Sequence, residues 1–202
     1  QALDGCGVWD CGRSLAAHCV YTTEEDWALM AEKGISCVHN PWSNLKLGSG
    51  VAPIPAMMRA GVNVALGTDG VASNNNLNLL EEVKLFATLF KATSADPTAI
   101  SARQALWAAT RAGALAQGRE DCGLMRTGMR ADLIVLDQRR RPYLHPCHDM
   151  VGNVVFAAQG SDVCLTMVDG RVLYRDGEYT TIDLERAIRN AETSARRIIS
   201  EL

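Results

Sequence analysis

The sequence has no long apolar segment, few aromatic residues and no excess of one charge. No apolar run approaches the roughly 20 residues that a helix needs to cross a bilayer, so we expect no membrane partner. Aromatic residues make up 5% of the 202 residues and the net charge is −3, so there is no electrostatic reason to expect nucleic acid as a partner. The 48% share of hydrophobic residues is typical of a globular protein with a buried core.

Patterns of disulfide frameworks and zinc knuckles are also missing. The seven cysteines are odd in number and scattered, and several lie inside apolar runs. Cys6 and Cys11 do not have the two-residue spacing of a zinc knuckle. The pattern favours reduced, buried thiols, and we therefore expect a cytoplasmic location.

The beginning of the chain has neither an initiator methionine nor the layout of a secretory signal peptide. Its first residue is Gln1. Three origins are open: a processed product, a partial reading frame, or an incomplete record of a longer protein.

Short apolar runs alternate with helical patterns through the first hundred or so residues, which predicts βα units and a parallel sheet. Thr22-Thr23-Glu24-Glu25 is typical of a helix start, and Gly34 of the end of the same helix. We expect three strands at 14–17, 35–38 and 62–66, helices at about 22–33, 53–60, 77–92 and 101–116, and a long loop over 39–50.

The pattern changes near Gly118. Short strands are predicted at 132–137, 163–168 and 171–174, and Asp169-Gly170 between the last two is a strong hairpin signal. The tail from 182 to 202 is an amphipathic helix that we expect to pack on the outside. We therefore divide the chain into a parallel α/β part, 1–118, and a small β part with a terminal helix, 119–202.

Three residues that can bind metal or transfer protons follow the three predicted parallel strands. His18 follows the first strand and His39 the second, and Asp69 lies in Gly67-Thr68-Asp69-Gly70 after the third. Each has a structural explanation when taken alone, because such loop residues often form hydrogen bonds or turns. In succession they favour a metal-dependent hydrolase, since the carboxyl ends of strands form the active sites of α/β barrels.

Three segments around these residues resemble the amidohydrolase superfamily. They are Ala16-Ala17-His18-Cys19-Val20, the stretch from His39 to Leu47, and the stretch from Gly67 to Asn75. Residues 128–137 and 168–177 resemble the return into that family's β-sandwich and its closing hairpin. Within the superfamily, the likeness is greatest to the 5-methylthioadenosine/S-adenosylhomocysteine deaminases and their cytosine-deaminase-like and triazine-hydrolase relatives.

The resemblance implies a (β/α)₈ barrel with a small β-sandwich, of which this chain supplies barrel strands six to eight and the C-terminal part of the sandwich. A complete barrel of this type takes roughly 250 residues. The family's His-x-His pair after the first strand, and its His with a following Glu after the fifth, have no counterpart here. We therefore expect the isolated chain to be inactive without the N-terminal half or a homo-oligomer partner.

The same resemblance implies hydrolytic deamination of an adenosine-type nucleoside, with release of ammonia. It implies one divalent metal ion, zinc or alternatively iron, and no organic cofactor. Asp69 matches the metal-ligating aspartate that also accepts a proton, and His18 matches the histidine that hydrogen-bonds the attacking water. A supporting or substrate-contacting role is implied for His39, Ser43, Asn44, Asn74 and Asn75. A guanine- or triazine-type amidohydrolase and an inactive fragment remain the alternatives.

Overall fold

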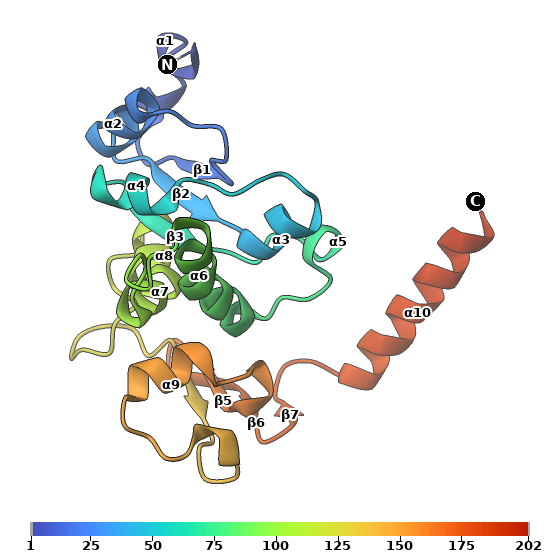
Figure 1. Cartoon of the computed structure of the whole chain (residues 1–202). Helices are drawn as coiled ribbons and strands as arrows, with labels where there is room; N and C mark the ends of the chain where they lie inside the picture. Colours follow the sequence, from blue (N-terminus) through green and yellow to red (C-terminus); the bar gives the residue numbers. More distant parts are fainter. Residues whose placement is uncertain (1, 202) are drawn as a thin grey trace.

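Two separate sheets organise the computed structural model, which describes residues 2–201 (Figure 1). The first is parallel, in the order β1-β2-β3, and the second is antiparallel, in the order β4-β5-β6-β7. The strands are β1 Leu15–Ala17, β2 Ser36–His39, β3 Val64–Leu66, β4 Leu133–Leu136, β5 Val163–Val168, β6 Arg171–Arg175 and β7 Glu178–Tyr179. With its helices the chain forms an α/β fold, as the alternating sequence pattern predicts.

Helices connect and cover the parallel strands. They are α1 Ala2–Gly5, the 3₁₀ helix η1 Val8–Cys11, α2 Glu24–Glu32, α3 Pro41–Lys46, α4 Ile54–Arg59, α5 Val71–Asn74, α6 Leu79–Ser94, α7 Ala102–Ala109 and α8 Arg111–Ala116. Helix α2 begins with a capping box, in which Thr23 accepts from the amide of Asp26 and Asp26 accepts from the amide of Thr23. The predicted start of this helix is confirmed.

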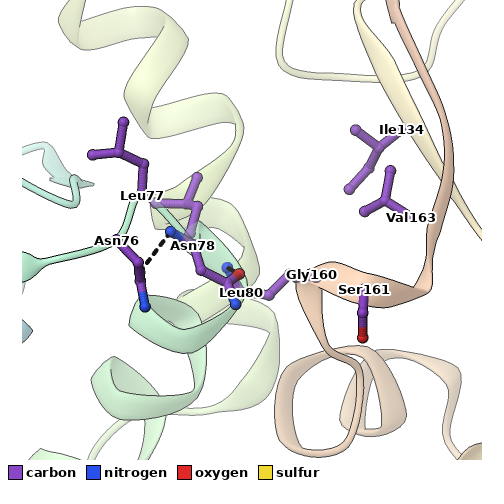
Figure 2. Close-up of a pocket in the computed structure, with 9 residues that line it drawn as sticks. Asn76, Leu77, Asn78, Leu80, Ile134, Gly160, Ser161 and Val163 are labelled. Atoms are coloured by element: carbon purple, nitrogen blue, oxygen red, sulfur yellow. Dashed lines mark hydrogen bonds between the residues drawn. The ribbon is translucent and has the colours of Figure 1, made fainter. Parts of the chain in front are cut away.

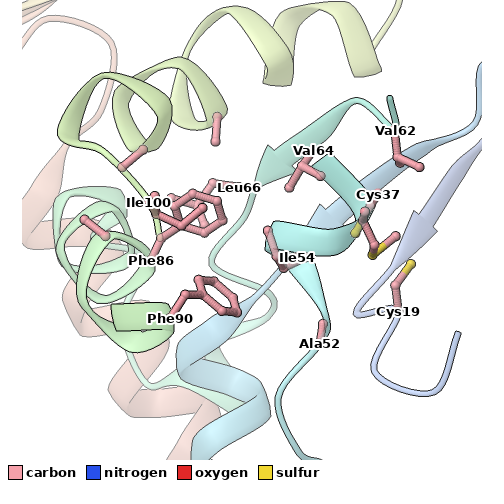
Figure 3. Close-up of a cluster of buried hydrophobic side chains, with 14 of the residues drawn as sticks. Cys19, Cys37, Ala52, Ile54, Val62, Val64, Leu66, Phe86, Phe90 and Ile100 are labelled. Atoms are coloured by element: carbon pink, nitrogen blue, oxygen red, sulfur yellow. The ribbon is translucent and has the colours of Figure 1, made fainter. Parts of the chain in front are cut away.

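The hydrophobic core lies between one face of the parallel sheet and helices α4, α6 and α7. Phe86, Ile54 and Ile100 are almost completely buried and point toward the strands (Figure 3). Complete burial of such a side chain contributes about 1.5–3 kcal/mol. The sheet contributes Cys37, Val64 and Leu66 to the same cluster. The side chains on this face hold the strands in a fixed position relative to the helices.

The opposite face of the parallel sheet is only partly covered among residues 2–201, since Leu15 of β1 is exposed whereas Ala65 of β3 is buried. Ala17 lies on this face and is exposed, and Val38 beside it is only half-buried. Strands β1 and β3 each pair only with β2, so each has an unpaired outer edge within the described part of the chain. Parallel sheets in proteins usually have both faces covered, whereas the β1 end of this face is left exposed.

The antiparallel sheet follows at residues 133–179 and is joined by short helices, η2 Pro142–Leu144, α9 Met150–Phe156 and η3 Gly160–Asp162. The predicted hairpin is confirmed, because β5 and β6 pair across Asp169 and Gly170, both of which have positive φ angles of 51° and 76°. An open cleft of about 590 Å³ lies between the start of α6 and this sheet. Figure 2 shows Leu77 on one side and Ile134 and Val163 on the other.

Three sequence expectations are wrong. The single helix predicted over 101–116 is divided at Thr110 into α7 and α8. The predicted loop over 39–50 contains α3, whose first residue, Pro41, has the φ angle of a helix start already fixed. The last helix, α10 Leu184–Ser200, projects away from both sheets (Figure 1), and all of its residues are exposed rather than packed on the outside. None of its apolar residues is buried within the described chain. In the same range, no helix combines the length and the apolar character needed to cross a membrane.

Candidate active site at the ends of the parallel strands

His18 and Asp69 lie together at the carboxyl end of the parallel sheet. The Nε2 atom of His18 is 3.8 Å from Oδ2 of Asp69, and the two side chains are 41% and 31% exposed. Both residues have left-handed backbones, with φ angles of 66° and 61°. Such angles cost about 1–3 kcal/mol each in residues other than glycine and are concentrated at functional sites. The sequence placed these two residues at strand ends, and the fold brings them together in a site open to solvent.

Helix α3 holds both side chains through two neighbouring residues. The Ser43 hydroxyl donates to Oδ2 of Asp69 at 2.6 Å, and Nδ1–H of His18 donates to Oδ1 of Asn44 at 2.7 Å. Ser43 and Asn44 are themselves buried. The supporting role expected for this pair therefore has a specific geometry, in which one short helix orients the histidine and the carboxylate.

The contact with Asn44 sets the expected tautomer of His18. With Oδ1 of Asn44 as the acceptor, Nδ1 bears the proton, and Nε2 of a neutral ring is then an acceptor that faces Oδ2 of Asp69. The 3.8 Å separation is too long for a direct hydrogen bond but suits a bridging water. A water in this position would meet two acceptors, which is the arrangement needed to withdraw its proton.

Donated hydrogen bonds keep Asp69 ionised. The Ser43 hydroxyl and then the Gly70 amide, at 2.7 Å from Oδ1, lower the pKa of Asp69 below its ordinary value. A charged carboxylate is a proton acceptor and a metal ligand at neutral pH.

His39 occupies a different environment from the other two strand-end residues. Its ring is completely buried and packs against Phe86 and Phe90, with centroids 5.9 and 5.6 Å away. Neither ring nitrogen has a hydrogen-bond partner among the described residues. Burial, with a smaller contribution from His18, lowers its pKa to about 3. Its expected contact with substrate stays a prediction, and the ring packs on the helical side of the sheet.

Asn74 and Asn75 brace the loop after β3. The side-chain amide of Asn74 donates at 2.6 Å both to the carbonyl oxygen of Thr68 and to the carboxylate of Glu82. Asn75 ends α5 with a left-handed backbone and accepts a hydrogen bond from Lys46 of α3.

Sequence reasoning missed Glu82. The only available signal was a second acidic residue in the first turns of a helix, which ordinarily indicates an exposed N-terminal charge.

The described residues can supply one ligand of a metal centre, but they do not form a complete set of ligands. Among residues 2–201, no group of three or more His, Cys, Asp or Glu side chains is placed to hold a metal ion. Zinc sites in proteins ordinarily have three or four protein ligands. Asp69 has the chemistry of a single ligand, with His18 beside it.

Comparisons with known proteins place this geometry in a family. The profile of the amidohydrolase family matches residues 2–173. A 5'-deoxyadenosine deaminase of Methanosarcina mazei is 46% identical over 93% of this chain and 43% of its own length. A 5-methylthioadenosine/S-adenosylhomocysteine deaminase of Dictyoglomus thermophilum is also 46% identical, over 93% of this chain and 44% of its own length.

The solved structures that are similar to this chain include two that contain zinc. An adenosine deaminase from Xanthomonas campestris with bound zinc superposes with a TM-score of 0.92 at 36% identity, over 98% of this chain and 45% of the other. A zinc complex of an atrazine chlorohydrolase from Arthrobacter aurescens gives a TM-score of 0.81 at 31% identity, over 89% of this chain and 40% of the other. This chain thus spans less than half the length of each of these proteins.

Proposed function

The chain belongs to the amidohydrolase family, and from that premise we propose that it takes part in the hydrolytic deamination of adenosine-type nucleosides. The relatives at 46% identity are named as deaminases of 5'-deoxyadenosine and of 5-methylthioadenosine or S-adenosylhomocysteine. The observation that supports the reaction in this chain is the solvent-open pair of His18 and Asp69, both oriented by α3.

We propose that the parallel sheet forms strands six to eight of a (β/α)₈ barrel, and that the antiparallel sheet forms part of a small β-sandwich. Three consecutive parallel strands with helices on one face and two unpaired outer edges are the arrangement expected of a barrel segment. The division of the chain into 1–118 and 119–202 follows from the same proposal, as the two sheets lie on either side of that boundary.

In this proposal His18 and Asp69 act on the water that attacks the nucleobase. Nε2 of His18 accepts a hydrogen bond from the water and orients it. Asp69, held ionised by Ser43 and the Gly70 amide, accepts the proton and returns it to the leaving amine. The product is ammonia and the corresponding hydroxylated base. Ser43 and Asn44 keep both groups in position, and Asn74 and Asn75 support the loop after Asp69.

We further propose that Asp69 is one ligand of a divalent metal ion, with zinc favoured and iron as the alternative. When bound, such an ion lowers the pKa of a water molecule toward neutrality. Zinc is present in the adenosine deaminase and atrazine chlorohydrolase structures. After dialysis, metal analysis of the 202-residue chain should find substoichiometric zinc, since Asp69 alone cannot hold it. One tightly bound zinc per chain would contradict this assignment.

The remaining ligands and the cover for the open sheet face are proposed to come from further chain of the same fold. The relatives have more than twice the matched length, and His18 and Asp69 follow β1 and β3, the two outer strands of the sheet. A second copy of this chain is the other possible source, and a dimer of the 202-residue chain with activity would favour it. The cytoplasmic location proposed for the protein depends on its cysteine pattern.

Deamination is tested by incubating the zinc-loaded protein, in its longest natural form, with 5-methylthioadenosine, S-adenosylhomocysteine and adenosine. Ammonia release should fall by at least about a hundredfold in Asp69→Asn, the loss that even outer partners of metal sites can produce. Glu120→Gln, on the surface and ion-paired to Arg13, is the matched control and should retain activity. No ammonia from any of the three nucleosides would overturn the proposal.

A triazine or guanine substrate is the second candidate, because triazine-acting enzymes share this fold at TM-scores of 0.79 to 0.84. The same assay with guanine and atrazine separates the candidates. Turnover of either in preference to the adenosine-type nucleosides would favour the alternative.

A further inference from the structure

Glu82 is a buried carboxylate close to the candidate site, and the proposed reaction gives it no part. It lies in the first turns of α6, and 1% of the residue is exposed. Its two oxygens accept hydrogen bonds from different elements. Oε2 accepts from the backbone amide of Trp42 at 3.2 Å, and Oε1 accepts from the side-chain amide of Asn74 at 2.6 Å.

The first of these hydrogen bonds lies at the start of α3. Trp42 is the second residue of that helix, and its amide has no partner within the helix. The side chain of Asn40, which precedes the helix, makes no capping hydrogen bond. Glu82 therefore supplies from α6 the cap that the local sequence does not provide. The next two residues along α3 are those that bind Asp69 and His18.

The second hydrogen bond lies in the loop of Asp69. Asn74, the last residue of α5, donates to Glu82 and also to the carbonyl oxygen of Thr68, the residue directly before Asp69. One carboxylate thus connects the helix that orients both candidate catalytic side chains with the loop that presents one of them.

We propose that Glu82 is a positioning residue for the His18–Asp69 pair, acting by holding α3 and the loop after β3 in one fixed relation. This role deepens the proposed function and rests on its assignment of the two catalytic side chains. Glu82 itself touches neither of them, so its effect passes through Ser43, Asn44 and Asn74.

The chemistry of the bridge requires a carboxylate. Burying such a group is costly unless both oxygens are satisfied, and here each oxygen has its own donor. A glutamine has a single acceptor oxygen and would direct its amide hydrogens at one of the two donors. A leucine would fill the space and leave both donors unpaired. A residue needed only for packing could be apolar, so the choice of glutamate points to the two-sided connection.

The test compares Glu82→Gln with Glu81→Gln in the 202-residue chain. Glu81 is the adjacent residue, and within residues 2–201 its side chain pairs with Asn76 and Asn78 rather than with α3 or Asn74, so its substitution has the same chemistry without cutting the bridge. NMR spectroscopy at one mildly alkaline pH reports the exchange of the Trp42 amide and the tautomer of the His18 ring. Thermal unfolding of each variant is measured in parallel.

In Glu82→Gln we expect Trp42 amide exchange to rise by about tenfold or more relative to the amides of β2, the range for loss of a hydrogen bond to a charged group. The His18 ring should change from a single Nδ1–H tautomer to a mixture. Glu81→Gln should show neither change. A lower melting temperature with an unchanged His18 tautomer would reduce Glu82 to a structural residue and overturn the proposal.

Asn74→Ala provides a second route if Glu82→Gln does not fold. It cuts the bridge on the side of Asp69 and leaves the bond between Glu82 and Trp42 in place. The Gly70 amide, which donates to Asp69, should exchange faster, while Trp42 exchange and the His18 tautomer stay near their original state. Unchanged Gly70 exchange in Asn74→Ala would also overturn the proposal. These measurements need no turnover, so a protein that releases no ammonia would refute the proposed function without deciding the role of Glu82.

Discussion

At the scale of single residues, His18 and Asp69 are placed by backbones that their side chains do not favour. Both have positive φ angles, and the surrounding hydrogen bonds from Ser43, Asn44 and the Gly70 amide offset that cost. The residue types and their places after strands were readable from the sequence. Their conformations were not, because a left-handed angle in a residue other than glycine depends on tertiary contacts.

His39 should make the stability of the fold depend on pH. Burial lowers its pKa to about 3 from its ordinary value of 6.5, so below about pH 6.5 the unfolded chain takes up a proton that the folded chain does not. Above that pH the ring does not reduce the free energy of unfolding. As the pH falls from about 6.5 toward 3, the free energy of unfolding decreases. Between about pH 7 and pH 5 the loss should be about 2 kcal/mol.

Denaturant unfolding of His39→Leu at these two pH values measures this contribution. The variant should lose less stability on acidification than the original protein, by about 2 kcal/mol. His145→Gln is the control, because His145 is exposed. If the original protein and His39→Leu lost the same free energy of unfolding between the two pH values, the pH dependence would not come from the His39 ring.

At the scale of elements, local signals suffice for some helices and fail for others. Helices α2 and α7 begin with complete capping boxes formed by neighbours in the sequence, and both were predicted near their observed positions. Helix α3 has no side-chain cap of its own and receives Glu82 from α6 instead. It was predicted as a loop, since a cap from forty residues away leaves no local pattern.

Removing the capping box of α2 should destabilise the fold measurably. Thr23→Ala deletes the acceptor for the Asp26 amide and should cost about 1 kcal/mol in the free energy of unfolding. Thr181→Ala, at an exposed position outside any helix or strand, should change it by less than about 0.5 kcal/mol. Chemical denaturation of the two variants checks the difference, and equal values would argue against the cap.

Helix α10 should be the least protected long helix in the isolated chain. Its apolar residues repeat at helical spacing, yet Ile188 and Ile199 are 50% and 71% exposed. A lone helix of this length is marginal in water without tertiary packing. Hydrogen exchange should therefore be much faster in α10 than in α6. Similar protection in both helices would show that α10 is covered in solution.

At the scale of the whole molecule, the described chain has a well-packed core on one side and uncovered surfaces on the other. The open face and edges of the parallel sheet, the apolar cleft beside α6 and the apolar stripe of α10 are separate parts of this surface. Exposed strand edges and contiguous apolar surface favour association. Each of these surfaces fits a fold that is completed by further chain.

The isolated chain is accordingly expected to self-associate. Sedimentation velocity should show species larger than the 21.8 kDa monomer. Replacing both Ile188 and Ile199 by lysine should lower the associated fraction, because it places charges on the apolar stripe of α10. Thr193→Lys, on the opposite side of the helix, is the matched control. A monodisperse monomer that melts cooperatively would contradict this expectation.

The sequence by itself determined the α/β class, the parallel strands, the β5–β6 hairpin and the residue types at the strand ends. These features follow from apolar spacing, caps and turn residues, which act between near neighbours. Only the tertiary structure decided that α3 exists, that His18 and Asp69 approach to 3.8 Å, that His39 packs into the helical layer, and that Glu82 connects α3 with the loop after β3. Those outcomes depend on contacts between residues far apart in the chain, and such contacts leave no periodic signal in the sequence.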